Sequence, residues 1–314
     1  MTDKLLKSLN ISLQEMRYIV ALGQECHFGK AASLCNITQP TLSIKIKDIE
    51  EKLGVTLFDR SQKKIALSAA GELILEQAKK TLLEANKISE ILQHSKDPMA
   101  GTLHIGIIPT IGPYLVPRLI APIKKAFPEL RLNIREDLTH HLIDQLDSGQ
   151  LDFILISPPL PNHHFELIDL YHEPFVLALP AIHPLCAKET IAISDIQKYT
   201  ILLLEEGHCL RDQTLDICTS KNIRSSEEIM GTSLETLRQM IALNAGISLF
   251  PQLSVSTLTN PGLKNEIQYR PLSSDKIGRL VSIAYRQGYP RAETIKKLAQ
   301  FIKKHLPSEV KIMN

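Results

Sequence analysis

One long helical pattern divides this 314-residue chain into a short head and a larger body. Ser68 is suited to cap the helix, and apolar side chains then recur alternately four and three residues apart over residues 69–95. This spacing is typical of a seam along which a helix pairs with a copy of itself. Packing of the helix on its own chain is the alternative. The expected seam positions are Ile74, Ala78, Thr81, Ala85, Ile88 and Leu92.

The head, residues 1–68, has the pattern of a winged helix-turn-helix. Ser12 and Glu15 form a capping box at the start of a first helix, and residues 28–35 form a short second helix. Thr38 then caps a third helix with proline in its first turn, where a missing N–H costs nothing. Two short strands at 56–60 and 65–67 follow as a wing.

The exposed face of the third helix and the wing predict contact with double-stranded DNA. Such a helix lies in a major groove, where Gln and Thr read bases and Lys meets phosphate. A mildly basic head, with 10 Lys and Arg against 7 Asp and Glu in residues 1–67, agrees with this function. The alternative is that Lys45 and Lys47 form an ordinary solvated helix face. The expected DNA-binding residues are Gln39, Pro40, Thr41, Ser43, Lys45 and Lys47 on the helix, with Arg60, Lys63 and Lys64 on or near the wing.

The body begins after a hinge at residues 96–101, where apolar runs start to alternate with helical patterns. This alternation indicates an α/β fold with parallel sheets and helices on both faces. The expected strands are 103–107, 130–134, 153–156, 175–179, 201–204, 247–250 and 281–285, and the expected helices are 114–127, 140–147 and 292–303.

Two cysteines in the body, Cys209 and Cys218, lie nine residues apart. His208 and Arg211 flank the first, and cationic neighbours favour the reactive thiolate. Asp212 could orient either of them. A second thiol can condense with a sulfenic acid to give a disulfide. Spacing alone proves little, because two structural thiols in the head have the same spacing and a free cysteine is most often a small buried hydrophobe. No role is argued for Cys26, Cys35 or Cys186.

Several classes of protein are disfavoured. The chain has no run of 18 apolar residues that would span a membrane, and residues 1–10 have no apolar signal core, so a cytoplasmic protein is expected. The sequence has no Cys-x-x-Cys and no zinc spacing, so we expect no metal and no cofactor.

Six short segments carry a family resemblance that runs from about residue 13 to about residue 298. HFGKAA at 27–32, TQPTLS at 38–43 and LGVTLFDR at 53–60 resemble the DNA-binding head of the LysR-type transcription regulators. IPTIGPYL at 108–115, TSLETLR at 232–238 and GHCLRDQ at 207–213 resemble the peroxide-responsive OxyR branch of that family.

The resemblance implies a body of two Rossmann-like lobes, similar to a periplasmic binding protein, with a cleft between them. Residues 102–172 and 277–314 would form the first lobe, and 173–276 the second. It also implies that Thr110, Thr139 and His208 bind hydrogen peroxide around Cys209, although N-capping is the commonest use of such threonines. Homotetramers built from dimers, and contact with RNA polymerase, are implied as well.

The resulting hypothesis is a transcription regulator in which Cys209 attacks peroxide and Cys218 resolves the product to a disulfide. Nine helical residues would separate these thiols by about 13 Å, whereas a disulfide needs Cα atoms within about 7 Å, so the segment must unwind. One alternative is a LysR-type regulator that binds an organic effector in the cleft. A thiol peroxidase is disfavoured because the chain lacks a Pro-x-x-x-Thr-x-x-Cys stretch, and a solute-binding protein because of the head.

Overall fold

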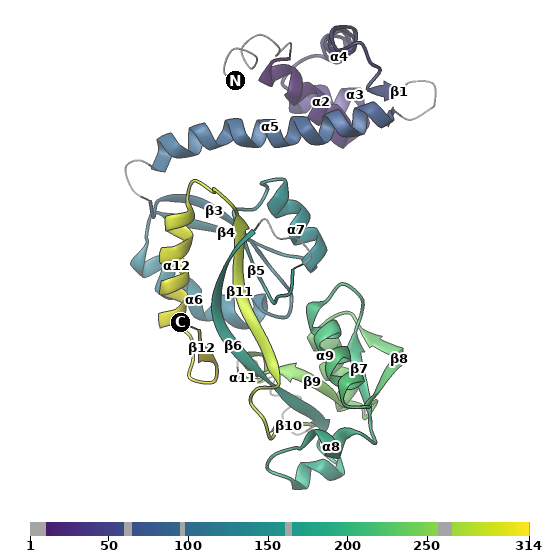
Figure 1. The fold of residues 1–314 in the computed structure, drawn as a ribbon, viewed down its shortest axis with the longest axis vertical. Coiled ribbons are helices and arrows are strands. Elements are labelled where there is room, and N and C mark those ends of the chain that lie inside the picture. The colour runs from purple at the N-terminus through teal and green to yellow at the C-terminus, as the bar shows by residue number, and fades with distance from the viewer. Residues whose placement is uncertain (1–10, 60–64, 95–97, 161–164, 257–265, 314) are drawn as a thin grey trace. The chain divides into compact units, whose positions relative to one another are not determined.

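The computed structural model describes residues 11–59, 65–94, 98–160, 165–256 and 266–313 (Figure 1). The chain forms two compact units, residues 1–93 and 94–314, and each is described by itself.

The first unit contains the expected helix-turn-helix. Its helices are α2 (Leu13–Glu25), α3 (Phe28–Leu34) and α4 (Gln39–Leu53). Ser12 and Glu15 make the expected capping box, and the Thr38 side chain accepts a hydrogen bond from the Thr41 N–H. The apolar face of α4 is buried through Leu42, Ile46 and Ile49. The helix boundaries and the buried face were therefore predictable from caps and periodicity.

The wing and the long helix follow. Strand β1 (Phe58–Asp59) pairs antiparallel with β2 (Ala66–Leu67), so both expected strands are present but shorter. The expected wing residues Arg60, Lys63 and Lys64 lie outside the described residues. Ser68 Oγ accepts from Gly71 N at 2.9 Å at the start of α5 (Ala69–His94), as the capping pattern predicted.

The seam of α5 is not uniform along its length. Ala78 is buried, and Ile74 packs against the core of the head, which also includes Leu75. Thr81 and Ala85 are half-buried, whereas the Ile88 side chain is 65 % exposed. The Leu92 side chain lies outside the described residues. The first part of the seam therefore packs on its own chain, and Ile88 remains open for a partner.

The second unit contains a mixed sheet, not the parallel sheets expected. Three of its strands run parallel: β3 (Gly101–Ile107), β4 (Leu130–Glu136) and β5 (Phe153–Ile156). Strand β11 (Gly278–Arg286) pairs antiparallel with β5. Strand β6 (Phe165–Pro180) pairs antiparallel with β11. The expected strand at 175–179 is only the apolar half of the sixteen-residue β6. In its first half, FELIDLYH, apolar and polar residues do not alternate regularly and most side chains are exposed or half-buried, so the hydrophobic pattern did not reveal a strand there.

The first lobe is built on β4-β3-β5-β11 and the first half of β6, with β12 (Lys311–Ile312) on the β6 edge. Helices α6 (Gly112–Ala126), α7 (Thr139–Asp147) and α12 (Ala292–Lys304) cover it (Figure 1). The core is continuous across the sheet and helices, and includes Leu103, Leu142, Ile154, Ile283 and Leu298.

The second lobe is built on the far half of β6, which pairs with β9 (Ser248–Pro251) and β10 (Ile267–Pro271). Strand β7 (Thr200–Leu204) pairs in parallel with β8 (Arg224–Gly231), and a parallel bridge joins Ile201 to Ile247. The remaining helical elements are η1 (Pro184–Ala187), α8 (Ile193–Ile196), α9 (Cys209–Ser220), α10 (Leu234–Ala242) and α11 (Gln252–Ser256). Because β6 runs through both sheets, it joins the lobes directly.

Candidate functional site

The candidate site begins at the loop that follows β7. This loop ends at Gly207, whose φ of 93° lies in the left-handed region that favours glycine. A Cβ at Gly207 would lie 3.0 Å from Leu138 Cδ1 and 3.4 Å from His140 Cε1. Leu138 and His140 flank the start of α7, which belongs to the other lobe. Gly207 therefore lets the second lobe approach the first closely, immediately before Cys209.

Cys209 is the first residue of α9, and its sulfur meets the first residue of α7. The distance from Cys209 Sγ to Thr139 Oγ1 is 2.8 Å. The N-cap of α7 is Leu138, with no side-chain cap, so the capping use considered for Thr139 is wrong. Two helix N-termini, one from each lobe, thus meet at one thiol. The N-terminus of a helix carries partial positive charge from its free N–H groups.

His208 precedes Cys209 and is 7 % exposed. Burial lowers the pKa of His208, although a backbone hydrogen bond with Thr232 and the charge of Glu205 act in the opposite direction. At neutral pH the side chain is therefore a neutral imidazole, not the cationic neighbour expected from the sequence.

Arg211 lies in the first turn of α9, with its side chain 19 % exposed. Its NH2 lies 3.7 Å from Glu206 Oε1 and its NH1 lies 4.0 Å from Asp212 Oδ1. Asp212 is thus placed beside Arg211, one of the two partners considered for it. Because the guanidinium is shared between two exposed carboxylates, these ion pairs are weak.

Thr110 is held in a buried ionic cluster at the junction of the lobes. Arg279 NH1 donates to Thr110 Oγ1 at 2.7 Å, and NH2 donates to the Thr110 carbonyl at 2.8 Å. The same guanidinium pairs with Glu173 at 2.8 Å, with both side chains 1 % exposed. Glu173 in turn accepts from Leu253 N at 2.8 Å. Thr110 is not an N-cap either, since α6 begins at Gly112 with Ile111 in that position.

Sequence reasoning missed Arg279, Glu173 and a further contact between the lobes. Gln213, one turn after Cys209, donates through Nε2 to Ser157 Oγ at 2.7 Å. Ser157 follows β5 and donates to the Leu280 carbonyl at 2.6 Å. Gln213 is the last residue of the GHCLRDQ segment and lies four residues after Cys209, which puts both on one helix face, but neither signal indicated Ser157 as its partner.

Cys218 lies near the other end of α9 and is 2 % exposed in the hydrophobic core. Both cysteines of the pair are free thiols. A helical rise of 1.5 Å per residue separates their Cα atoms by about 13 Å, well beyond the roughly 7 Å that a disulfide allows. The expected arrangement, one helix holding two separated thiols with the second shielded, is therefore present.

We expect Cys218 to make stability depend on pH in the alkaline range. Burial raises the pKa of Cys218 from 9.0 to about 11. An unfolded thiol ionises from about pH 9 while the folded one stays neutral, so stability present below pH 9 is lost as pH rises to 11. The loss should reach about 2–3 kcal/mol.

Urea unfolding of the reduced protein at pH 8 and pH 10.5 measures this loss. Cys218→Ala should lose less stability over that interval than the wild type. Cys186→Ala is the matched control, because Cys186 is only half-buried. An equal loss in wild type and Cys218→Ala would contradict the assignment.

The residues of α4 expected to meet DNA are nearly all exposed. Gln39, Pro40, Thr41, Lys45 and Lys47 are exposed, and Ser43 is half-buried. In the head, Cys26 is exposed and Cys35 half-buried. Lys47 Nζ forms an ion pair with Glu51 Oε1 at 3.6 Å. The Thr41 hydroxyl is hydrogen-bonded to the Thr38 hydroxyl at 2.8 Å.

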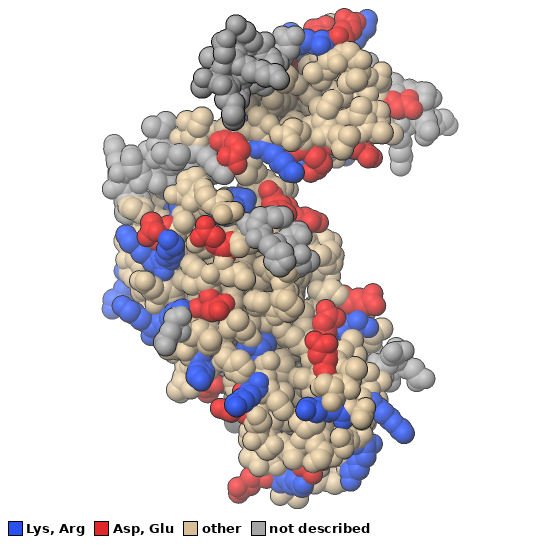
Figure 2. Space-filling view, in the orientation of Figure 1, with Lys and Arg blue, Asp and Glu red and all other residues tan. Residues whose placement is uncertain are grey.

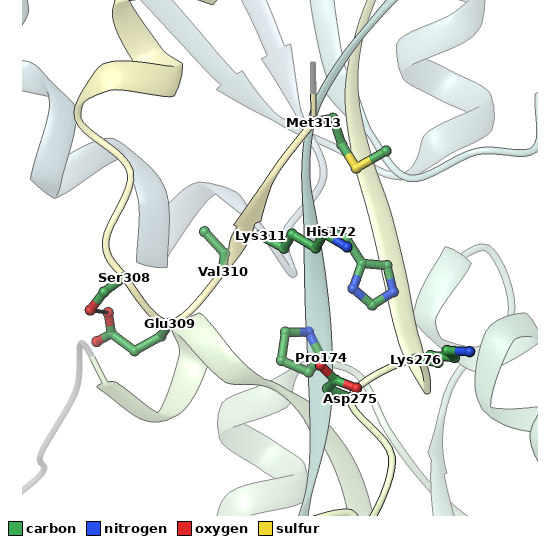
Figure 3. Close-up of a pocket in the computed structure, with 9 residues that line it drawn as sticks. All are labelled: His172, Pro174, Asp275, Lys276, Ser308, Glu309, Val310, Lys311 and Met313. Atoms are coloured by element: carbon green, nitrogen blue, oxygen red, sulfur yellow. Dashed lines mark hydrogen bonds between the residues drawn. The ribbon is translucent and has the colours of Figure 1, made fainter.

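A cavity of about 610 Å³ lies beside β6 and β12, away from the cysteine site (Figure 3). Its walls carry opposite charges, and no predicted site residue lines it. They are formed by His172, Pro174, Asp275, Lys276, Ser308, Glu309, Val310, Lys311 and Met313.

Across the described part of the chain, His, Cys, Asp and Glu side chains form no group of three that could hold a metal. No helix within the described ranges is long and apolar enough to cross a membrane.

Comparison with known proteins gives the same two-part division. Residues 13–72 match the bacterial regulatory helix-turn-helix proteins of the lysR family, and residues 96–307 match the LysR substrate binding domain. The chain is 37 % identical over 296 residues to the hydrogen peroxide-inducible genes activator of Dickeya chrysanthemi, covering 94 % of this chain and 96 % of the relative.

Two solved structures of OxyR proteins are similar over nearly the full length. A full-length OxyR variant from Pseudomonas aeruginosa aligns with a TM-score of 0.79 and 39 % identity, covering 98 % of this chain and 99 % of that one. A mutant of Corynebacterium glutamicum OxyR, bound to H2O2, aligns with a TM-score of 0.64 and 30 % identity, covering 95 % and 94 %.

Proposed function

The chain belongs to the LysR family of bacterial helix-turn-helix regulators, and we propose that it senses hydrogen peroxide through a disulfide between Cys209 and Cys218. The observation that carries the proposal is the contact of Cys209 Sγ with Thr139 at two helix N-termini. A second thiol lies buried in the same helix. The relative named as a hydrogen peroxide-inducible activator and the solved H2O2-bound relative support the choice of oxidant.

In the first step, the Cys209 thiolate attacks one peroxide oxygen and the O–O bond breaks. The sulfur becomes a sulfenic acid, and the second oxygen leaves as hydroxide, which is protonated to water. Thr139 and the neutral His208 are placed to hydrogen-bond the peroxide, because one touches the sulfur and the other precedes it in the chain. We assign Thr110 a supporting role, since its hydroxyl already accepts from Arg279.

In the second step, Cys218 attacks the oxidised sulfur and water leaves. The two thiols together give up two electrons and two protons, so one peroxide yields one disulfide and two waters. The buried thiol of Cys218 first has to leave the core, because its helix holds it about 13 Å from Cys209. Unwinding of α9 would break the bond from Gln213 to Ser157 and separate Thr139 from the sulfur, so a local oxidation becomes a change between the lobes.

The DNA-binding role is assigned to the head. The exposed side of α4 offers Gln39 and Thr41 for bases and Lys45 and Lys47 for phosphates, with Arg60, Lys63 and Lys64 as further candidates. By contrast, Figure 2 shows Lys and Arg interspersed with Asp and Glu over the visible face of the body. We propose a cytoplasmic homodimer joined along α5 through positions such as Ile88, assembled into a tetramer that contacts operator DNA and RNA polymerase.

The proposal predicts stoichiometric oxidation and not turnover, which separates a regulator from a thiol peroxidase. Mass spectrometry of thiols after about one equivalent of peroxide should show loss of two thiols in the 209–218 peptide. Footprints of reduced and oxidised protein on a selected DNA site should differ. Intact thiols at that dose, together with a footprint that responds to an organic metabolite, would favour the organic-effector alternative.

A further inference from the structure

Arg291, at the start of α12, holds the segment by which the body joins the linker. The residue is 4 % exposed. Its NH1 donates to the Thr102 carbonyl at 2.9 Å, and NH2 donates to the carbonyls of Ala100 at 2.8 Å and Pro98 at 3.4 Å. Thr294 Oγ1 adds a second bond to Pro98 at 2.7 Å. One guanidinium thus fixes three backbone carbonyls in the first residues of the body, and nothing about the cysteine chemistry requires this.

The same part of the chain also holds the end of α7 that lies away from Cys209. Arg286, the last residue of β11, donates through NH1 to the carbonyl of Leu146, in the last turn of α7. It also donates to the Leu151 carbonyl at 2.6 Å. Since Thr139 at the first turn touches Cys209 Sγ, α7 is held at one end by the sulfur and at the other by Arg286.

The connection between Arg286 and Arg291 is itself fixed. Tyr289 OH donates to Asp152 Oδ1 at 2.7 Å, and Asp152 Oδ2 accepts from His104 N at 2.6 Å. The Arg286 guanidinium lies 5.3 Å from the Tyr289 ring centre. Figure 1 shows α12 beginning at the end of the body where β3 begins. A displacement of α7 therefore has a continuous, packed path to the carbonyls at 98–102.

We infer that Arg291 is a positioning residue that couples the state of Cys209 to the start of the body, along α7, Arg286 and the β11–α12 connection. The inference rests on the proposed function. When Cys209 Sγ bonds to Cys218, Thr139 loses its partner and α7 loses that attachment to the second lobe. The bonds at Arg286 and Arg291 then pass the new position of α7 to the segment that leads to the linker helix.

The test compares Arg291→Gln with Arg270→Gln in the full-length protein. Arg270 is a matched control, because its guanidinium also binds backbone carbonyls, those of Lys188 and Cys186, both at 2.9 Å, but in the second lobe and off the path. Each protein is treated with one equivalent of peroxide. Thiol oxidation is followed by mass spectrometry, hydrogen exchange is measured over residues 98–104, and DNA contact is measured by footprinting.

Arg291→Gln should form the disulfide to the wild-type extent, while the oxidation-dependent change in exchange and footprint falls at least fivefold. Arg270→Gln should keep both changes. If Arg291 only stabilises the fold, Arg291→Gln should lower the melting temperature but leave the oxidation-dependent changes in exchange and footprint intact. That result would overturn the inference. If Arg291→Gln does not fold, Thr294→Val is tested in its place. It should reduce the oxidation-dependent changes in exchange and footprint, and unchanged values would again contradict the inference. Failure of the wild type to form a disulfide would instead reject the proposed function.

Discussion

Replacing Cys209 with serine should abolish peroxide-driven disulfide formation and with it the oxidation-dependent footprint. The serine hydroxyl is not a thiolate and cannot be oxidised by peroxide to a sulfenic acid. The remaining thiol is a poor substitute, because Cys218 is buried and its pKa is raised to about 11 by burial. We expect the rate of thiol loss at pH 7.5 to fall by at least 100-fold, measured by quenching with iodoacetamide and mass spectrometry.

The complementary variant tests the order of the two steps. In Cys218→Ser the first oxidation should proceed and stop at a sulfenic acid on Cys209, which dimedone traps. Cys186→Ser is the control, because Cys186 is half-buried in a different part of the second lobe and its sulfur donates to the Pro180 carbonyl. Dimedone on Cys218 in the Cys209→Ser protein would reverse the assigned roles.

The second large effect concerns the ionic cluster between the lobes, where Arg279→Met should destabilise the body by about 3–5 kcal/mol. The substitution leaves the Glu173 carboxyl group 1 % exposed and without its guanidinium partner. It also removes both donors to Thr110. For a unit of this size the melting temperature should fall by about 6–20 °C.

A double-mutant cycle separates the charge effect from the loss of packing. Glu173→Gln in the Arg279→Met background removes the unpaired charge and keeps an oxygen that can accept from Leu253 N. The double variant should therefore be more stable than Arg279→Met alone, by calorimetry at pH 7. A double variant that is less stable than either single one would show that the pair does not dominate this junction.

The sequence predicted the starts of the helices best, because a capping side chain next to the helix decides each of them. Ser12, Thr38 and Ser68 begin helices because a side-chain oxygen satisfies a free N–H at each start. It predicted the topology of the body less well, because apolar and polar residues do not alternate regularly in the first half of β6. Its pairing is set by β11, which lies far along the chain.

In the candidate site, too, local features could be predicted from the sequence and contacts between distant residues could not. The family resemblance placed Thr139 beside Cys209, and their side chains are in contact. The ion pair of Arg279 with Glu173 could not be predicted, since residues more than 100 positions apart meet only after the sheet has formed. The neutral state of His208 also depends on burial, which a flanking sequence does not reveal.

The pairing of β11 with β5 has a consequence for folding during synthesis, because the two strands lie far apart in the sequence. During synthesis β5 emerges about 120 residues before the strand that completes its edge. At about 5–20 residues per second the ribosome needs about 6–24 s to deliver β11. Through that interval β5, which pairs with β3 on one side, has its other edge unpaired, and all four residues of Phe153–Ile156 are buried in the finished protein. The nascent chain should therefore depend on chaperones until β11 has been made, and a polypeptide truncated before residue 278 should aggregate.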